Sequence, residues 1–171
     1  MITWLRHSKV AMWLLTVLRV YLGFQWASDG FAKLTGPKPF DASGLIMGAI
    51  KHPVTDPTGA KAFPWYDWFL NTFTNHGHAT AAFSFLVSWG ELLVGLGLIF
   101  GTLTLAASFF ALVMNFSYLG AGVVSVNPTY IILGGILLIS GFNSGKIGLD
   151  RWVTPFLRSK FPFLNNDIQV D

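Results

Sequence analysis

Residues 80–100, TAAFSFLVSWGELLVGLGLIF, are long enough to cross a bilayer as a helix and carry one charged side chain, Glu91, near the middle. A carboxylate at that depth costs about 2.5–3.5 kcal/mol even on the more lenient insertion scale. We therefore expect Glu91 to have a partner. A second apolar run, residues 10–28, has Arg19 near its own midpoint. The two runs together predict a buried pair between Arg19 and Glu91.

The composition of the whole chain is that of a membrane protein. Of its 171 residues, 53% are hydrophobic and 11% are charged, whereas about 25% are charged in a soluble domain. Four apolar runs fill most of the chain, so we expect residues 1–171 to form a single membrane domain. The chain has no cysteine, which excludes disulfides, cysteine-held iron–sulfur clusters and cysteine-based zinc sites.

The four apolar runs predict an all-α protein, a bundle of four transmembrane helices at about 10–28, 80–100, 102–120 and 128–144. The basic start followed by an apolar run also fits a signal peptide. Arg19 interrupts that run, however, and the bulky Gln25 and Trp26 make a poor cleavage site. We therefore interpret residues 10–28 as a membrane span.

The segments outside the spans predict how the protein lies in the membrane. The long first loop, residues 30–79, contains short apolar or aromatic helices such as 64–73, PWYDWFLNTF, which suit the membrane interface. The tail, residues 146–171, mixes basic and aromatic residues and should lie along the membrane surface. The two ends carry six basic residues close to span ends: Arg6, Lys9, Lys146, Arg151, Arg158 and Lys160. The positive-inside rule then places both termini in the cytoplasm and the long loop outside.

Each predicted span has one face of small or polar residues, which should look into the bundle. Arg19, Glu91 and Asn115 lie on these faces. At about 1.5 Å per residue, Arg19 and Glu91 would both lie roughly 13 Å from the cytoplasmic ends of their spans. The trio has two interpretations. It either fixes the register of the helices, or it binds a polar head group or quinone ring, with Glu91 handling protons.

Four further residues are candidates near this centre. Asp29 and Lys33 are spaced i,i+4 and could form a helical ion pair or contribute to a ligand site. Trp26 and Trp89 could serve packing or offer a stacking surface for a ring.

The histidines give little evidence of a metal or haem site. His76 and His78, with His52 in the same loop, are too few to predict a metal site. No predicted span contains a histidine, so a haem held by two histidines inside the bilayer is not expected.

Several runs together resemble a known family. They are RVYLGFQWASDGFAKLTG at 19–36, WGELLVGLGLIFGTLT at 89–104, MNFSY at 114–118 and SVNP at 125–128. With the pattern Arg19, Gly23, Gly30 and Lys33 followed by Glu91, the chain resembles the DoxX/DoxD family of small four-helix membrane proteins over nearly its whole length. The long, tryptophan-rich first loop is more similar to the DoxD branch, the small subunit of thiosulfate:quinone oxidoreductase.

The resemblance implies a multi-pass protein of a bacterial or archaeal plasma membrane that is linked to quinone chemistry and works with a redox partner subunit. Its motif positions correspond to Arg19, Lys33, Glu91 and Asn115. Because no DoxA-like soluble segment is fused to the chain, complete thiosulfate oxidation by this chain alone is not expected. Quinone is the expected cofactor, without haem or iron–sulfur clusters in this chain.

The residues and the resemblance together define the expected site. Glu91 and Arg19 are the catalytic candidates. The expected ligand-binding set is Arg19, Trp26, Asp29, Lys33, Trp89, Glu91 and Asn115. Two other functions stay open, a non-enzymatic scaffold for a redox or stress-response complex and a transporter of small molecules or lipids. Expected partners are membrane lipid, a redox subunit and a further copy of the chain, but not nucleic acid.

Overall fold

The computed structural model describes residues 1–162, and within this range the fold is entirely helical apart from an isolated bridge between Thr55 and Lys61. The all-α prediction is therefore confirmed. In chain order the elements are α1 (Ile2–His7), α2 (Lys9–Thr35), α3 (Ser43–Lys51), α4 (Pro64–Phe73), α5 (Ala81–Phe100), α6 (Thr104–Gly120), α7 (Asn127–Ile139), the 3₁₀ helix η1 (Gly141–Ser144) and α8 (Asp150–Lys160).

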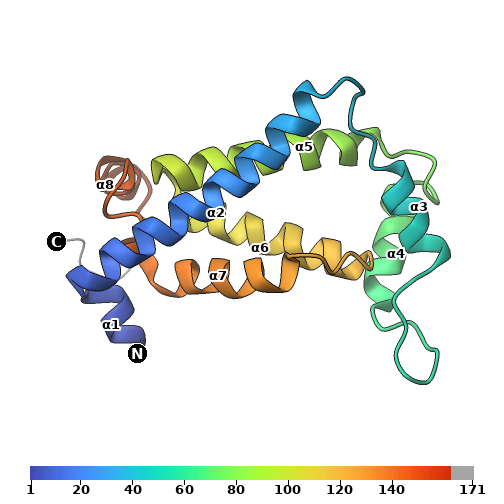
Figure 1. The fold of residues 1–171 in the computed structure, drawn as a ribbon, viewed down its shortest axis with the longest axis horizontal. Helices are drawn as coiled ribbons and strands as arrows, with labels where there is room; N and C mark the ends of the chain where they lie inside the picture. The colour runs from blue at the N-terminus through green and yellow to red at the C-terminus, as the bar shows by residue number, and fades with distance from the viewer. Residues whose placement is uncertain (163–171) are drawn as a thin grey trace.

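Four long helices form the body of the molecule, and shorter helices close its two ends (Figure 1). α2 packs mainly on α5, while α6 packs on both α5 and α7. α3 and α4 lie together at one end, and α1 and α8 lie at the other (Figure 1). This arrangement places residues from α2, α5 and α6 around a common interior.

Two of these helices, α2 and α5, are long and apolar enough to cross a membrane. α5 matches the predicted run 80–100 almost residue for residue, and α2 extends the predicted run 10–28 as far as Thr35. The runs 102–120 and 128–144 correspond to α6 and α7, which are apolar but have only 17 and 13 residues. A perpendicular span needs about 20 residues, so these two helices do not meet that length on their own.

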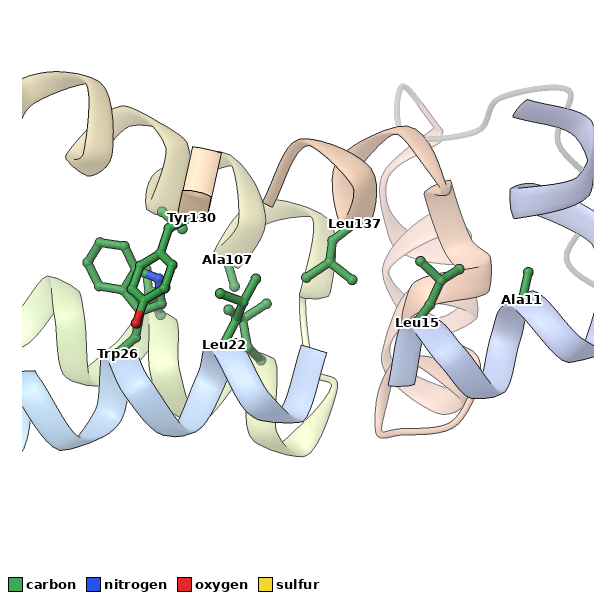
Figure 2. Packing of buried hydrophobic residues seen from close by; sticks show 10 residues of the cluster. Ala11, Leu15, Leu22, Trp26, Ala107, Tyr130 and Leu137 are labelled. Atoms are coloured by element: carbon green, nitrogen blue, oxygen red, sulfur yellow. The ribbon is translucent and has the colours of Figure 1, made fainter. Parts of the chain in front are cut away.

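The hydrophobic core lies where the long helices meet. Leu15, Leu22 and Trp26 of α2 point toward α6 and α7, where Trp26 meets Tyr130 of α7 (Figure 2). A second, smaller cluster of Ala49, Tyr66 and Leu70 joins α3 to α4. The inner faces of the long helices thus contribute an apolar core, although they also bury polar residues such as Arg19, Glu91 and Asn115.

The outer faces of the same helices are also apolar. Large exposed side chains include Phe24 on α2, Phe85 on α5, Phe109 and Phe116 on α6, and Ile132 on α7. Large apolar side chains exposed on all four long helices indicate contact with a membrane or a partner.

The predicted helices of the first loop are present as α3 and α4, and the tail begins with α8. α4 starts with Pro64 in its first turn, a position where proline loses no hydrogen bond. α8 is amphipathic, with exposed Trp152 and Phe156 beside basic residues, as expected for the tail. The end of the predicted tail, 163–171, lies outside the described residues.

Candidate functional site

Three glycines bring α2 and α5 into backbone contact. A Cβ atom at Gly30 would lie 2.3 Å from the backbone nitrogen of Leu92, and one at Gly95 would lie 2.2 Å from that of Ala27. At Gly23 the nearest atom, the backbone nitrogen of Ile99, would be 2.7 Å away. Only glycine allows such an approach, as in the small-residue contacts of membrane helices. The contact sets the register of α2 on α5 and places Gly30 level with Glu91.

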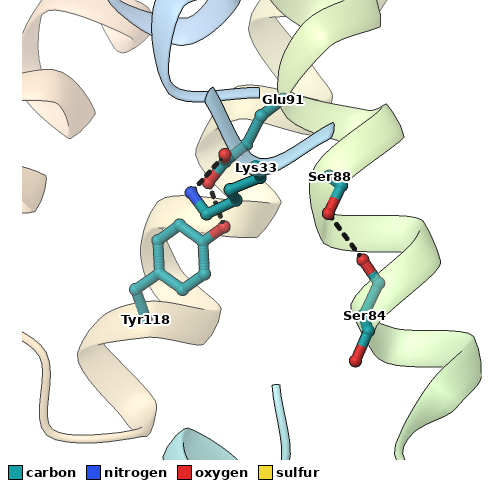
Figure 3. Close-up of polar contacts among 5 residues, drawn as sticks. All are labelled: Lys33, Ser84, Ser88, Glu91 and Tyr118. Carbon is teal, nitrogen blue, oxygen red and sulfur yellow. Dashed lines mark hydrogen bonds and ion pairs between the residues drawn. The ribbon is translucent and has the colours of Figure 1, made fainter. Parts of the chain in front are cut away.

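With α2 and α5 in this register, Glu91 lies at the centre of a polar cluster, which we call the Lys33–Glu91–Tyr118 cluster (Figure 3). Glu91 is only 3% exposed. Its Oε2 atom forms an ion pair with Lys33 Nζ, and its Oε1 atom accepts a hydrogen bond of 2.7 Å from the Tyr118 hydroxyl. Three helices, α2, α5 and α6, each supply one member.

The cluster has no net formal charge, because the ammonium of Lys33 offsets the carboxylate of Glu91. The two partners compensate part of the cost of burying a carboxylate. The Lys33 side chain is 25% exposed, and its Nζ atom also lies 5.3 Å from the centre of the Phe40 ring. The cluster therefore has one side that water or a ligand can reach.

The chemistry of the three groups suits proton transfer and recognition of a carbonyl. An ammonium and a phenol are both donors, and the carboxylate between them is an acceptor. A ligand carbonyl that displaced part of this network would meet a donor and a nearby base. Such a set of groups is an acid–base candidate when it lies in a low-dielectric site.

The predicted pair between Arg19 and Glu91 is wrong. Arg19 is 2% exposed, and its guanidinium donates to backbone carbonyls, namely Leu98 at 2.7 Å, Ile99 at 3.5 Å and Ile147 at 2.6 Å. Leu98 lies seven residues after Glu91, or about 10 Å along the helix axis. The prediction failed because it compared the depths of Arg19 and Glu91 as counted from assumed ends of their spans. The glycine contacts between α2 and α5 instead place Arg19 beside the end of α5.

Arg19 belongs instead to a junction where four segments meet. The last carbonyls of α5 have no partner within the helix, and a cation there is favourable. In the turn between α5 and α6, Asp150 of α8 accepts hydrogen bonds from the backbone nitrogens of Leu103 at 2.7 Å and Thr104 at 2.8 Å. Gly101 has a φ of +61°, and a Cβ there would lie 2.1 Å from an Arg19 nitrogen. We call this arrangement the Arg19–Asp150 junction.

The other predicted ligand residues are dispersed around the cluster. Asn115 is 0% exposed, and neither its oxygen nor its nitrogen has a hydrogen-bond partner within residues 1–162. Trp26 is buried against the Tyr130 ring, with 6.4 Å between ring centres. Trp89 and Asp29 are both exposed. Lys33 pairs with Glu91, and the helical ion pair with Asp29, one of the two interpretations of their spacing, is not formed among the described residues.

Two serines continue the polar face of α5 toward the first loop. The Ser88 hydroxyl donates to the backbone carbonyl of Ser84 at 2.9 Å (Figure 3). The Ser84 hydroxyl in turn accepts from the backbone nitrogen of Ala42 at 2.9 Å. These contacts hold the start of α3 against α5.

The sequence interpretation missed two residues, Tyr118 and Asp150. Tyr118 follows Asn115 by three residues, so the helical period places it near the same face and could have indicated it. Asp150 gave no local signal, because its partners Leu103 and Thr104 are 47 and 46 residues away in the chain. Within residues 1–162 no group of three or more acidic, histidine or cysteine side chains is placed to hold a metal ion.

Comparison of the chain with protein-family models, curated proteins and solved structures finds no match.

Proposed function

We propose that the chain is a DoxX/DoxD-like membrane protein that acts as the membrane subunit of a quinone-linked oxidoreductase and binds the quinone head group at the Lys33–Glu91–Tyr118 cluster. In this proposal α2, α5, α6 and α7 all cross the plasma membrane, with both termini in the cytoplasm. The electron donor would be oxidised by a partner subunit.

The exposed apolar faces of all four long helices support the membrane arrangement. α2 and α5 meet the length of a span, and η1 follows α7 in the chain after Ser140. Shorter apolar helices can cross when the bilayer thins locally or flanking side chains extend to the interface.

The observation on which the functional proposal depends is the Lys33–Glu91–Tyr118 cluster itself. A buried carboxylate held by an ammonium and a phenol between apolar helices is costly, and ionisable groups in such places are functional candidates by default. Reduction of a quinone adds protons as well as electrons. Tyr118 and Lys33 could donate to the quinone oxygens while Glu91 relays the proton.

Binding of a quinone to the purified full chain in nanodiscs tests the proposal. Short-tailed ubiquinone and menaquinone analogues would be titrated against tryptophan fluorescence. Because a hydrogen bond to a charged group contributes about 1.5–3 kcal/mol, Tyr118→Phe and Glu91→Gln should each weaken binding by roughly tenfold or more. Tyr130→Phe is the matched control, since it removes a buried phenol that bonds to Gln25 and not to Glu91. Equal affinity of all three variants, or no binding by the wild-type chain, would contradict the proposal.

A non-enzymatic scaffold is the second candidate, and one observation favours it. Both oxygens of Glu91 already have partners within the chain, so the cluster could serve only to hold three helices together. In that case Tyr118→Phe would lower thermal stability and leave any activity of the assembled complex unchanged.

A further inference from the structure

A cavity of about 810 Å³ lies between α5 and α6, and we call it the α5–α6 groove. Its volume is within the range of small-molecule sites, about 300–1,000 Å³. Small residues, Gly90 and Gly97 of α5 and Ala106 of α6, make room for it. Exposed Leu93 and Phe110 are among its lining residues, so the groove is open toward the surroundings of the helices.

The groove is long as well as apolar. Its lining on α5 extends from Phe83 to Phe100, about 25 Å along the helix at 1.5 Å per residue. α3 and α4 close one end with Ile46 and Leu70. Tyr66 also lines this end, and burial raises its pKa to about 12, so its phenol stays neutral. A long apolar channel closed at one end suits a hydrocarbon chain better than a compact polar molecule.

The other end of the groove reaches the turn between α5 and α6, where α8 is attached. Phe100 lines the groove there, and its carbonyl accepts a hydrogen bond of 3.0 Å from the backbone nitrogen of Leu149. Lys146 and Arg151 lie within a few residues of this contact, and Arg151 is exposed. The nearby Asp150 carboxylate is already occupied by backbone nitrogens of the turn. The segment attached to this end of the groove therefore carries two basic residues, Lys146 and Arg151.

From the groove and these two basic residues we infer a specific site for an anionic membrane phospholipid. One acyl chain runs along the α5–α6 groove toward α3 and α4, and the phosphate head group lies beside Lys146 and Arg151. Anionic head groups are attracted by basic residues at the membrane surface, which gives the site its charge preference. Tyr118 of the Lys33–Glu91–Tyr118 cluster also lines the groove, but the proposed head group lies past Phe100, which is nine residues after Glu91 on α5. The lipid site therefore does not require quinone binding, and its head-group contacts are tested by variants outside the cluster.

Native mass spectrometry of the full chain released from detergent micelles tests this site. The probes are phosphatidylglycerol and phosphatidylcholine with identical acyl chains. We expect one tightly retained phosphatidylglycerol and weaker retention of phosphatidylcholine. Ala106→Phe should fill the groove and reduce retention of both lipids at least tenfold, whereas the control Leu105→Phe, on the same helix but outside the groove, should not. Val113→Phe is a second groove-filling variant at an exposed position.

The head-group half of the site is tested separately. At about 1 kcal/mol per basic residue near the surface, Lys146→Gln and Arg151→Gln should each weaken phosphatidylglycerol binding about fivefold and leave phosphatidylcholine unchanged. Lys51→Gln, an exposed basic residue on α3, is the control. Three results would overturn the inference. The first is equal retention of the two lipids by the wild-type chain, and the second is displacement of the lipid by a quinone analogue that fills the groove. The third is a dimer of the wild-type chain that dissociates when Ala106→Phe is introduced.

Discussion

Arg19 stabilises the fold at the Arg19–Asp150 junction, and its loss should therefore be seen first in stability. Its guanidinium spans carbonyls of two segments, which a shorter apolar side chain cannot do. We expect Arg19→Met to lower the free energy of unfolding by about 2–4 kcal/mol, since charged hydrogen bonds contribute about 1.5–3 kcal/mol each and one buried charge is removed with them. Arg19→Lys should recover part of that loss.

Thermal unfolding of the purified chain in detergent measures this effect. Arg6→Gln is the control, because the exposed Arg6 donates one hydrogen bond of 2.9 Å to the Ile139 carbonyl. If Arg19→Met were as stable as the wild-type chain but no longer bound quinone, Arg19 would belong to the ligand site and not to a structural junction.

The contrast between Arg19 and Lys33 shows how far single residues could be interpreted from the sequence. The cost of burying Glu91 correctly predicted a cationic partner, and Lys33 was among the expected site residues. The choice between the two cations depended on the register of α2 against α5. That register comes from backbone contacts at Gly23, Gly30 and Gly95, which no pattern of polarity encodes.

The contact between α2 and α5 makes its own prediction. Alanine is a better helix former than glycine by about 1 kcal/mol, so Gly→Ala normally stabilises a helix. At Gly30 the added Cβ would meet the Leu92 backbone at 2.3 Å, and the two helices must move apart. We expect Gly30→Ala to destabilise the fold by about 1–3 kcal/mol, the usual cost of overpacking, and to weaken the Lys33–Glu91 pair.

Gly135→Ala is the matched control within α7, because a Cβ there meets nothing within 4 Å. It should be neutral or slightly stabilising in the same unfolding assay. If Gly30→Ala behaved like Gly135→Ala, the backbone contact between α2 and α5 would not be tight, and the register argument for Lys33 would fail.

Helix positions were predictable to a greater degree than helix contacts. Apolar runs located α2, α5, α6 and α7, and the aromatic run 64–73 located α4. The attachment of α8 to the turn between α5 and α6 was not predictable, because its hydrogen bonds join segments nearly fifty residues apart. Long-range backbone contacts of this kind depend on the packed fold, and no local pattern in the sequence predicts them.

The distribution of charge over the whole molecule predicts its orientation in a membrane. Basic residues of α1 and α8 gather at one end, and the loop between α3 and α4 lies at the other (Figure 1). Because the chain has no cysteine, single cysteines can be introduced as unique labels. Ala60→Cys, in the exposed loop, should react with a membrane-impermeant maleimide in intact cells, and Ser159→Cys, on exposed α8, should react only after lysis. The opposite pattern would reverse the proposed orientation. Equal labelling of both positions in intact cells would contradict a chain that separates its two ends by a bilayer.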